Sequence, residues 1–442
     1  MKEVEKVLKR AVDEKVKFVN LWFVDILGQL KSVTIRDREL EKALSEGIGF
    51  DGSSVEGFAR IYESDLLLKP EAETFRILNW CSTPQERVAA FFCDILTPEG
   101  EGYAGDGRLA LKRVMEQARR QGFNFCVGPE LEYFYFKDNG SVPGLTDQGG
   151  YFDFAPIDLG SDLRQETVSL AEDMGIEIDT GHHEVAPSQH ELDLRYGNAL
   201  ELADDIITVK MLTKEVARRH NLYASFMPKP VFGENGSGMH VHMSLFRGRE
   251  NAFFDDRDPD KLSAVARGFA AGVLAHSREV TAICNQWVNS YKRLVPGYEA
   301  PVYIAWARSN RSSLVRIPAF KHGKPTAARI EFRSPDPACN PYLAFAVVLA
   351  AGLAGIEKGL QLPAPVEADI FSMDEKTRKR HHINHLPGSL IEAILETGRS
   401  RLVRAALGDH IFEKFIENKQ IEWDRYRTQV TDYELKAYLP IL

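Results

Sequence analysis

The chain has 442 residues, including 55 lysines and arginines and 64 aspartates and glutamates, and its formal net charge is −9. This length allows two or three domains with a large core. The negative charge argues against nucleic acid and anionic membranes as partners. The five cysteines include no CxxC pair, which argues against a zinc site or a disulfide framework and favours a reduced, cytoplasmic setting.

The first hundred residues predict a small mixed domain. Apolar side chains at helical spacing predict an amphipathic helix over residues 4–12. Aromatic and β-branched residues predict a strand at 18–24 that turns at Gly28, and further strands follow at 32–35 and 88–95. A Thr-Pro-Glu-Gly stretch at 97–100 breaks the pattern. We place a domain boundary there, between residues 1–100 and 101–442.

The second part predicts alternating helices and strands. It opens with a helix at 108–121 and a strand at 125–136, and the alternation continues to about residue 360. The longest apolar run, residues 344–356, is too short to span a bilayer and predicts a buried helix. Residues 369–385 are polar and charge-rich and predict a surface loop, and helices dominate from residue 390 onward.

Paired carboxylates are the first sign of chemistry. Glu130 and Glu132 lie two apart in an otherwise apolar strand, so both point to one face. Two like charges on a buried face are costly unless a cation or an arginine lies between them, although a solvated strand face is the alternative for this pair alone. Glu184 and Glu191 bracket Pro187, which would break a zinc-protease helix, so a strand–turn–strand arrangement is expected instead.

Two further segments alternate charged side chains in the same way. His240 and His242 follow a glycine-rich turn, and Glu331 lies between Arg329 and Arg333. The candidate metal ligands are therefore five glutamates and one histidine, a mostly hard-oxygen set that favours Mg²⁺ or Mn²⁺ over zinc or copper. Six ligands are too many for one Mg²⁺, so two ions are expected.

A basic block lies inside this acidic chain. Residues 292–333 contain nine lysines and arginines but only two acidic residues, Glu299 and Glu331. Apolar residues alternate with the arginines, so many are expected to be half-buried and to need carboxylate or phosphate partners. No Walker A loop and no GxGxxG fingerprint is present, so metals and arginines would have to hold any nucleotide.

Taken in order, these segments resemble type I glutamine synthetase, from residues 50–54 to residues 422–424. The resemblance implies an α+β fold, with a small N-terminal β-grasp-like domain and a large catalytic domain that has a curved antiparallel sheet flanked by helices and a C-terminal helical arm. It also implies a dodecamer of two hexameric rings, with active sites between subunits and residues 432–439 as an arm buried in the opposite ring.

The resemblance also implies a role for each matching residue. Two metal ions would be held by Glu132, Glu184 and Glu191, and by Glu130, His240 and Glu331. The glutamate substrate would contact Glu132, Asn235, Gly236, Arg293 and Arg333. ATP would contact Asp179, His242, Ser244, Arg316 and Arg329, with Arg311 and Arg316 on its phosphates and the transferring phosphoryl group. Ammonium would bind at Asp51, Tyr151 and Glu299, the last within a flap with glycine and proline hinges.

Some positions depart from the family pattern. Asp179 stands where a glutamate is common, and Thr326 where a phosphate-binding lysine is common, with Lys324 as a possible substitute. Phe371 lies near the tyrosine that some members adenylylate, which favours the non-adenylylated branch. Arg60 resembles a product-feedback position of that branch, with a surface arginine as the equal alternative.

Two other functions compete with an ammonia ligase. A sister ligase that joins glutamate to a polyamine or another amine should lose the anions of the ammonium pocket, yet Asp51 and Glu299 are both present. A non-catalytic, regulatory member should lose metal ligands, yet all six are present. The sequence therefore favours the ATP-dependent ligation of ammonia to glutamate.

Overall fold

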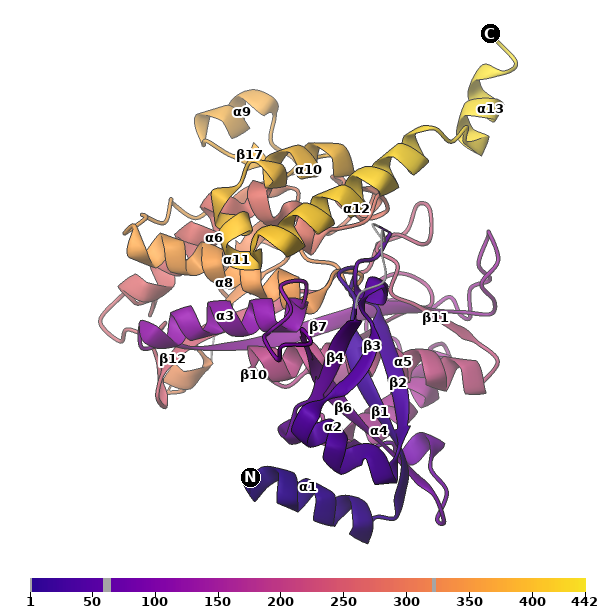
Figure 1. The fold of residues 1–442 in the computed structure, drawn as a ribbon. Coiled ribbons are helices and arrows are strands. Elements are labelled where there is room, and N and C mark those ends of the chain that lie inside the picture. Colours follow the sequence, from indigo (N-terminus) through magenta and orange to yellow (C-terminus); the bar gives the residue numbers. More distant parts are fainter. Residues whose placement is uncertain (1, 59–64, 320–322) are drawn as a thin grey trace.

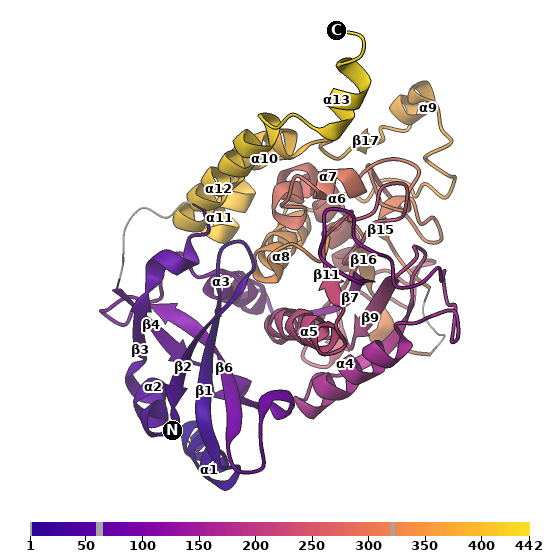
Figure 2. The same cartoon turned by 90° about the vertical axis from the view of Figure 1, so that its right-hand side faces the viewer.

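The computed structural model describes residues 2–58, 65–319 and 323–442. Its strands form two sheets that lie in different parts of the molecule (Figures 1 and 2). Arg60 lies outside the described residues, so its predicted feedback role stays a prediction.

The N-terminal sheet has the strand order β2-β1-β6-β4-β3, with β5 beside β6. Its central pair, β1 and β6, is parallel, and the other pairs are antiparallel. Its apolar side chains meet those of two helices in a separate cluster that includes Val19, Leu21 and Phe91. The elements are α1 (Lys2–Asp13), β1 (Val16–Val24), β2 (Leu30–Arg36), α2 (Leu40–Glu46), β3 (Ile48–Asp51), β4 (Asp65–Pro70), β5 (Arg76–Ile77) and β6 (Arg87–Leu96).

The larger sheet has the order β17-β14-β15-β16-β12-β7-β9-β8, with three short strands beside it. Its pairs are antiparallel except β14 with β15. The strands are β7 (Asn124–Phe136), β8 (Ile178–His183), β9 (Gln189–Leu194), β10 (Gly197–Asn198), β11 (Tyr223–Ser225), β12 (Val241–Arg247), β13 (Glu250–Asn251), β14 (Tyr303–Ala307), β15 (Ser313–Arg316), β16 (Ile330–Phe332) and β17 (Asn384–His385). This mixed α+β architecture confirms the predicted fold class.

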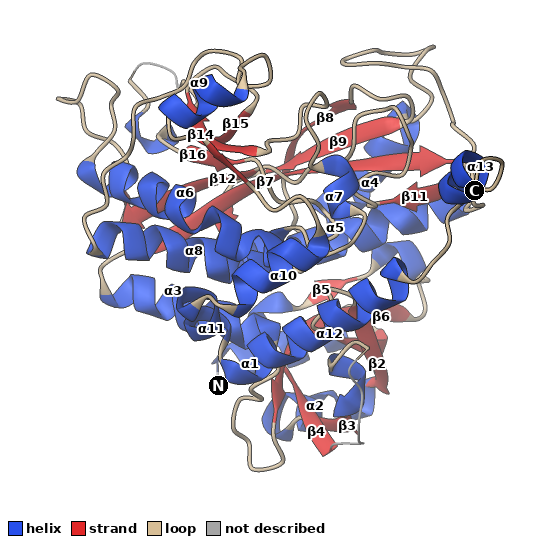
Figure 3. Ribbon diagram, turned by 90° about the horizontal axis from the view of Figure 1, so that it is seen from above, coloured by secondary structure: helices blue, strands red, loops and turns tan. Residues whose placement is uncertain are grey.

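Helices cover this sheet, and α3, α6 and α8 run side by side (Figure 3). Helices α6 and α8 approach so closely that a Cβ on Gly272 would lie 2.2 Å from the carbonyl oxygen of Ala351. Helix α8 is the apolar run that was predicted to be a buried helix, and it is buried. The helices are α3 (Gly107–Arg120), α4 (Ser161–Asp173), α5 (Ala199–Arg219), α6 (Ala264–Cys284), α7 (Ser290–Arg293), α8 (Pro341–Glu357), α9 (Glu375–Arg380), α10 (Leu390–Gly398), α11 (Arg401–Leu407), α12 (Asp409–Arg427) and α13 (Asp432–Tyr438).

Two features concern the C-terminal third. The segment predicted as a plain surface loop, residues 369–385, contains α9 and the short strand β17. Helix α13 projects away from the rest of the chain in both views (Figures 1 and 2), and apolar side chains near it, such as Tyr433 and Leu439, are exposed. Among the described residues, no helix is long and apolar enough to cross a membrane.

Candidate functional site

The larger sheet forms one wall of a cavity of about 380 Å³. All six predicted metal ligands line it: Glu130, Glu132, Glu184, Glu191, His240 and Glu331. Eight other predicted residues line it as well: Tyr151, Asn235, Gly236, Arg293, Glu299, Arg311, Arg316 and Arg333. We call this cavity the carboxylate pocket.

Strand β7 presents Glu130 and Glu132 to the pocket, as period two predicts. The Glu132 carboxylate accepts hydrogen bonds from the Gln189 side chain at 3.0 Å and from the Gly238 backbone at 2.9 Å. Glu130 lies 3.0 Å from Nδ1 of His240 and 2.7 Å from Nε2 of His242. The two alternating histidines therefore converge on one carboxylate.

Strands β8 and β9 form the predicted strand–turn–strand around Pro187, and this turn brings Glu184 and Glu191 to the same pocket. His182 joins them, with its Nε2 atom 3.2 Å from Glu191. Ligand atoms of His182, Glu184 and Glu191 lie within 4.8 Å of one another, and so do those of Glu130, His242 and Glu331. Both groups could hold a metal ion.

The surroundings shift the pKa values of these carboxylates in opposite directions. Burial raises the pKa of Glu132 to about 7. Burial, together with the nearby Glu132, raises the pKa of Glu184 to about 8 and that of Glu191 well above its usual value. Burial also opposes ionisation of Glu130, but its hydrogen bonds with His240 and His242 hold its pKa well below the usual range. Glu132, Glu184 and Glu191 thus form a group that lacks a cation.

Arginines line the other side of the pocket. Glu331 is fully buried and pairs with Arg316 and, at 2.6 Å, with Arg333. Burial opposes ionisation of Glu331, but the charges of Arg333, His240 and His242 outweigh it and lower the pKa of Glu331. Arg293 is buried and donates to the backbone carbonyl of Ser334 at 2.7 Å. The pocket therefore joins a negative group to a positive one, as expected from the basic block.

Of the five predicted nucleotide residues, Arg316 lines the carboxylate pocket, and the other four lie in an adjoining cavity of about 360 Å³. Its wall contains Asp179, His242, Ser244, Arg329 and Thr326, and it shares Glu130, Thr180 and Asp193 with the carboxylate pocket. Arg329 donates from Nε to Nδ1 of His242 at 3.2 Å. Lys324 is exposed and is not among the residues lining either cavity, so its predicted phosphate contact stays a prediction.

Asp51 is the one predicted catalytic residue that the pocket of this chain does not include, as far as the described residues show. It is exposed at the end of β3, and its side chain accepts a hydrogen bond from the Ser53 backbone at 2.9 Å. Glu299 and Tyr151 do reach the pocket, where the Arg311 guanidinium lies 5.6 Å from the centre of the Tyr151 ring. Glu299 lies 4.0 Å from Arg311.

Sequence reasoning missed several lining residues, among them His182, Gln189 and Asp193. Strand alternation could have found them. His182 lies two positions before Glu184, and Gln189 and Asp193 lie two positions on either side of Glu191, so each shares a face with a predicted ligand.

Comparisons with known proteins identify the family of the chain. Residues 104–438 match the glutamine synthetase catalytic domain, and residues 15–98 match the glutamine synthetase β-grasp domain. The chain is 49% identical over 439 residues to a glutamine synthetase of Clostridium saccharobutylicum, with 98% of each chain covered. It is 48% identical over 444 residues to one of Mycolicibacterium smegmatis, with all of each chain covered.

Solved structures have the same fold. A GmaS/ADP complex matches with a TM-score of 0.88 and 30% identity, and covers 98% of this chain and 99% of its own. Glutamine synthetase from Plasmodium falciparum matches with a TM-score of 0.89 and 25% identity, and 98% of each chain is covered.

Proposed function

Because the chain belongs to the glutamine synthetase family, we propose that it ligates ammonia to the γ-carboxylate of L-glutamate, with conversion of ATP to ADP and phosphate. The observation that carries the assignment of roles is the convergence of all six predicted metal ligands and four predicted arginines on one pocket. We also propose that the protein works in the cytoplasm and belongs to the non-adenylylated branch, since Phe371 has no hydroxyl to modify.

The chemistry of the ligand set fits divalent metal ions. Glu132 and Glu191 are buried and Glu184 is half-buried, and all three have raised pKa values, so a bound cation would relieve their repulsion. These three would hold one ion, and Glu130, His240 and Glu331 a second, with Mg²⁺ or Mn²⁺ preferred. Bound ions would neutralise the phosphates of ATP. His182 and His242 lie close enough to contribute as well.

The positive side of the pocket suits the anionic substrates. Arg316 is only partly buried and lies beside Glu331, from where it can reach a phosphoryl group. Arg293 and Arg333 are buried deeper, next to Asn235 and Gly236, and would hold the carboxylates and the amino group of glutamate. Asp179, His242, Ser244 and Arg329 would contact the nucleotide in the adjoining cavity.

The reaction needs an activated carboxylate. The γ-carboxylate oxygen of glutamate attacks the γ-phosphorus of ATP, ADP leaves, and γ-glutamyl phosphate forms. Ammonium loses a proton to a carboxylate of the pocket, and ammonia then attacks the γ-carbonyl carbon and expels phosphate. Tyr151 and Glu299 would attract ammonium, and the flap that carries Glu299 would exclude water from the acyl phosphate.

We propose a shared active site in a dodecamer. Asp51 does not line the described pocket of its own chain, so a neighbouring subunit would supply it. The exposed apolar residues of the C-terminal arm, including Tyr433, Tyr438 and Leu439, would be covered in the opposite ring.

The test is a product assay with ATP, L-glutamate and Mg²⁺, and with either ammonium or a panel of amines and polyamines. We expect glutamine, ADP and phosphate in equal amounts with ammonium. Faster turnover with an amine would refute the assignment of the acceptor, and no turnover with any acceptor would refute the assignment as a ligase.

A further inference from the structure

Behind the carboxylate pocket lies a second, fully buried cluster of charged side chains. On β9, Gln189 and Glu191 face the pocket, so His190 between them points to the opposite face of the hairpin. His183 pairs with His190 across the two strands, and their rings lie 4.9 Å apart. Both histidines are fully buried.

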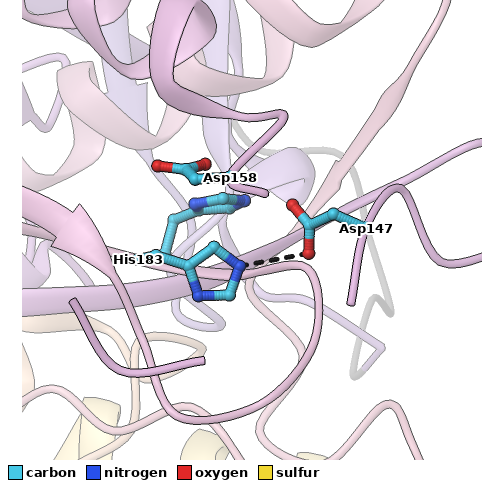
Figure 4. Close-up of side chains that lie close together, drawn as sticks. Asp147, Asp158 and His183 are labelled. Atoms are coloured by element: carbon cyan, nitrogen blue, oxygen red, sulfur yellow. Dashed lines mark hydrogen bonds and ion pairs between the residues drawn. The ribbon is translucent and has the colours of Figure 1, made fainter. Parts of the chain in front are cut away.

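Each histidine is tied to an aspartate of one loop, residues 147–158. Nε2 of His183 lies 3.1 Å from Asp147 (Figure 4). Nδ1 of His183 lies 2.7 Å from the backbone carbonyl of Glu184. His190 contacts the Arg164 guanidinium at 2.7 Å, and Arg164 pairs with Asp158. The two aspartates are the two ends of the loop.

Asp147 also accepts hydrogen bonds from backbone amides of two segments, the loop itself and the turn between β8 and β9. Its carboxylate accepts from the amide of Ser188 at 2.8 Å, in the turn between Glu184 and Glu191. It also accepts from the amide of Gly149 in the loop at 3.2 Å and from that of Leu159, the residue after the loop, at 3.3 Å. One side chain therefore joins the turn that presents two predicted metal ligands to the loop that carries Tyr151.

The loop passes over the two imidazole rings at very short range. A Cβ on Gly149 in the loop would lie 2.6 Å from Nε2 of His183, and a Cβ on Gly160, just after the loop at the start of α4, would lie 2.4 Å from the His190 ring. Phe152, Phe154 and Ile157 in the loop are all more than half exposed, although the Phe152 ring lies 4.6 Å from the His182 ring and the Phe152 amide donates to the backbone carbonyl of His183 at 3.0 Å. The contacts of Asp147 with His183 and of Asp158 with Arg164 attach the loop through buried side chains.

We propose that Asp147 and Asp158 are positioning residues. Asp147 acts through His183, and Asp158 acts through Arg164 and His190. Together they hold the Glu184–Glu191 hairpin and Tyr151 in fixed relative positions. This inference rests on the proposed function, because it assigns the hairpin to a metal ion and Tyr151 to ammonium. Ligand atoms of Asp147, Asp158, His183 and His190 lie within 4.8 Å of one another, a spacing that a metal ion could use. Arg164 already supplies a cation to Asp158 there, so the cluster serves as an internal ionic clamp.

The decisive variant is Asp147→Asn, which keeps the shape and an oxygen acceptor but removes the charge that faces His183. In metal-stripped protein titrated with Mn²⁺ and followed by electron paramagnetic resonance, we expect one class of sites to weaken by about 10- to 100-fold. We also expect the KM for ammonium to rise, and turnover at saturating Mg²⁺ and ammonium to recover most of the wild-type rate. Hydrogen exchange should become faster in residues 148–157 and not elsewhere.

Asp204→Asn is the matched control, because Asp204 is an equally buried carboxylate that binds Arg108 and Tyr342 away from both cavities. It should lower the melting temperature and leave Mn²⁺ binding and the KM for ammonium unchanged. Asp158→Asn tests the other end of the loop with the same expectations as Asp147→Asn, should that variant not fold.

Unchanged Mn²⁺ affinity, KM and local exchange in a folded Asp147→Asn or Asp158→Asn variant would overturn the clamp. A wild-type protein that makes no glutamine would instead overturn the proposed function, so the two failures can be told apart.

Discussion

Replacing Glu299, the residue of the proposed flap, should affect stability and catalysis to different extents. Its carboxylate lies 4.0 Å from Arg311, and the side chains are 53% and 59% exposed. An exposed ion pair contributes at most about 1 kcal/mol, so Glu299→Ala should lower the free energy of unfolding by less than that. The structure therefore predicts a variant that folds normally.

The effect on ammonium should be larger than the effect on folding. A carboxylate and an ammonium ion 4 Å apart attract each other by about 4 kcal/mol at an effective dielectric of 20. Because Glu299 is half-exposed, we reduce this to about 1–2 kcal/mol, which corresponds to a rise of about 5- to 30-fold in the KM for ammonium. Water should also reach the acyl phosphate more easily.

The assay measures glutamine and phosphate in the same sample over a range of ammonium concentrations. Wild-type protein should release one phosphate per glutamine, and Glu299→Ala should release more. Glu375→Ala is the control, because Glu375 is an exposed carboxylate paired with Lys379 at 2.6 Å and lines neither cavity. If Glu299→Ala keeps the wild-type KM and product ratio, residue 299 has no part in the ammonium pocket or the flap.

Three further outcomes are expected. Glu132→Gln and Glu331→Gln should each lower turnover by at least about a hundredfold, since the loss of about 3 kcal/mol of transition-state stabilisation has that effect. The circular dichroism spectra of both variants should stay native. Near-normal rates at saturating Mg²⁺ would show that Glu132 and Glu331 are not metal ligands. Without metal, stability should fall as the pH rises from about 4.5 through the folded-state pKa values of about 7 for Glu132 and about 8 for Glu184, because the folded state binds more protons there than the unfolded state. Mn²⁺ should therefore raise the melting temperature more at pH 8 than at pH 6, and an equal rise at both would contradict the raised pKa values. Asp51→Ala and Glu331→Ala subunits should be nearly inactive alone but regain activity when refolded together; monomers in size-exclusion chromatography, or no recovery in verified mixed oligomers, would contradict a shared site.

Which carboxylates line the carboxylate pocket could be predicted because strand geometry is local. Period two alone places Glu130 beside Glu132, and one proline fixes the turn between Glu184 and Glu191. Which histidine lies nearer to a given carboxylate depends on the register between β12 and β7, which no local pattern specifies. His242 was expected to contact nucleotide, yet it also lies against Glu130.

Two other features, the helix α9 and the buried clamp, were not predicted from the sequence. The helix α9 was missed because its charged residues were taken as a loop, although Asp374 caps it by accepting from the Thr377 amide, and Glu375 pairs with Lys379 one turn later. The buried clamp joins segments that are distant in sequence, such as Asp147 and His183. Only the folded chain shows that these charges are buried, so no local pattern in the sequence could pair them.

The charges of the pocket also indicate what kind of ligand completes it. Glu132, Glu184 and Glu191 repel one another and hold protons more tightly than isolated carboxylates do, so this side lacks a cation. On the other side, one buried carboxylate, Glu331, faces both Arg316 and Arg333, so positive charge exceeds negative charge on this side.

A cation alone would balance the charge of the first side only, and an anion alone would balance that of the second side only. A divalent ion bound together with a polyphosphate satisfies both, because each neutralises the charge that the other brings into the pocket. The fold thus holds two unbalanced groups a short distance apart, and we expect metal and nucleotide to increase each other's affinity there.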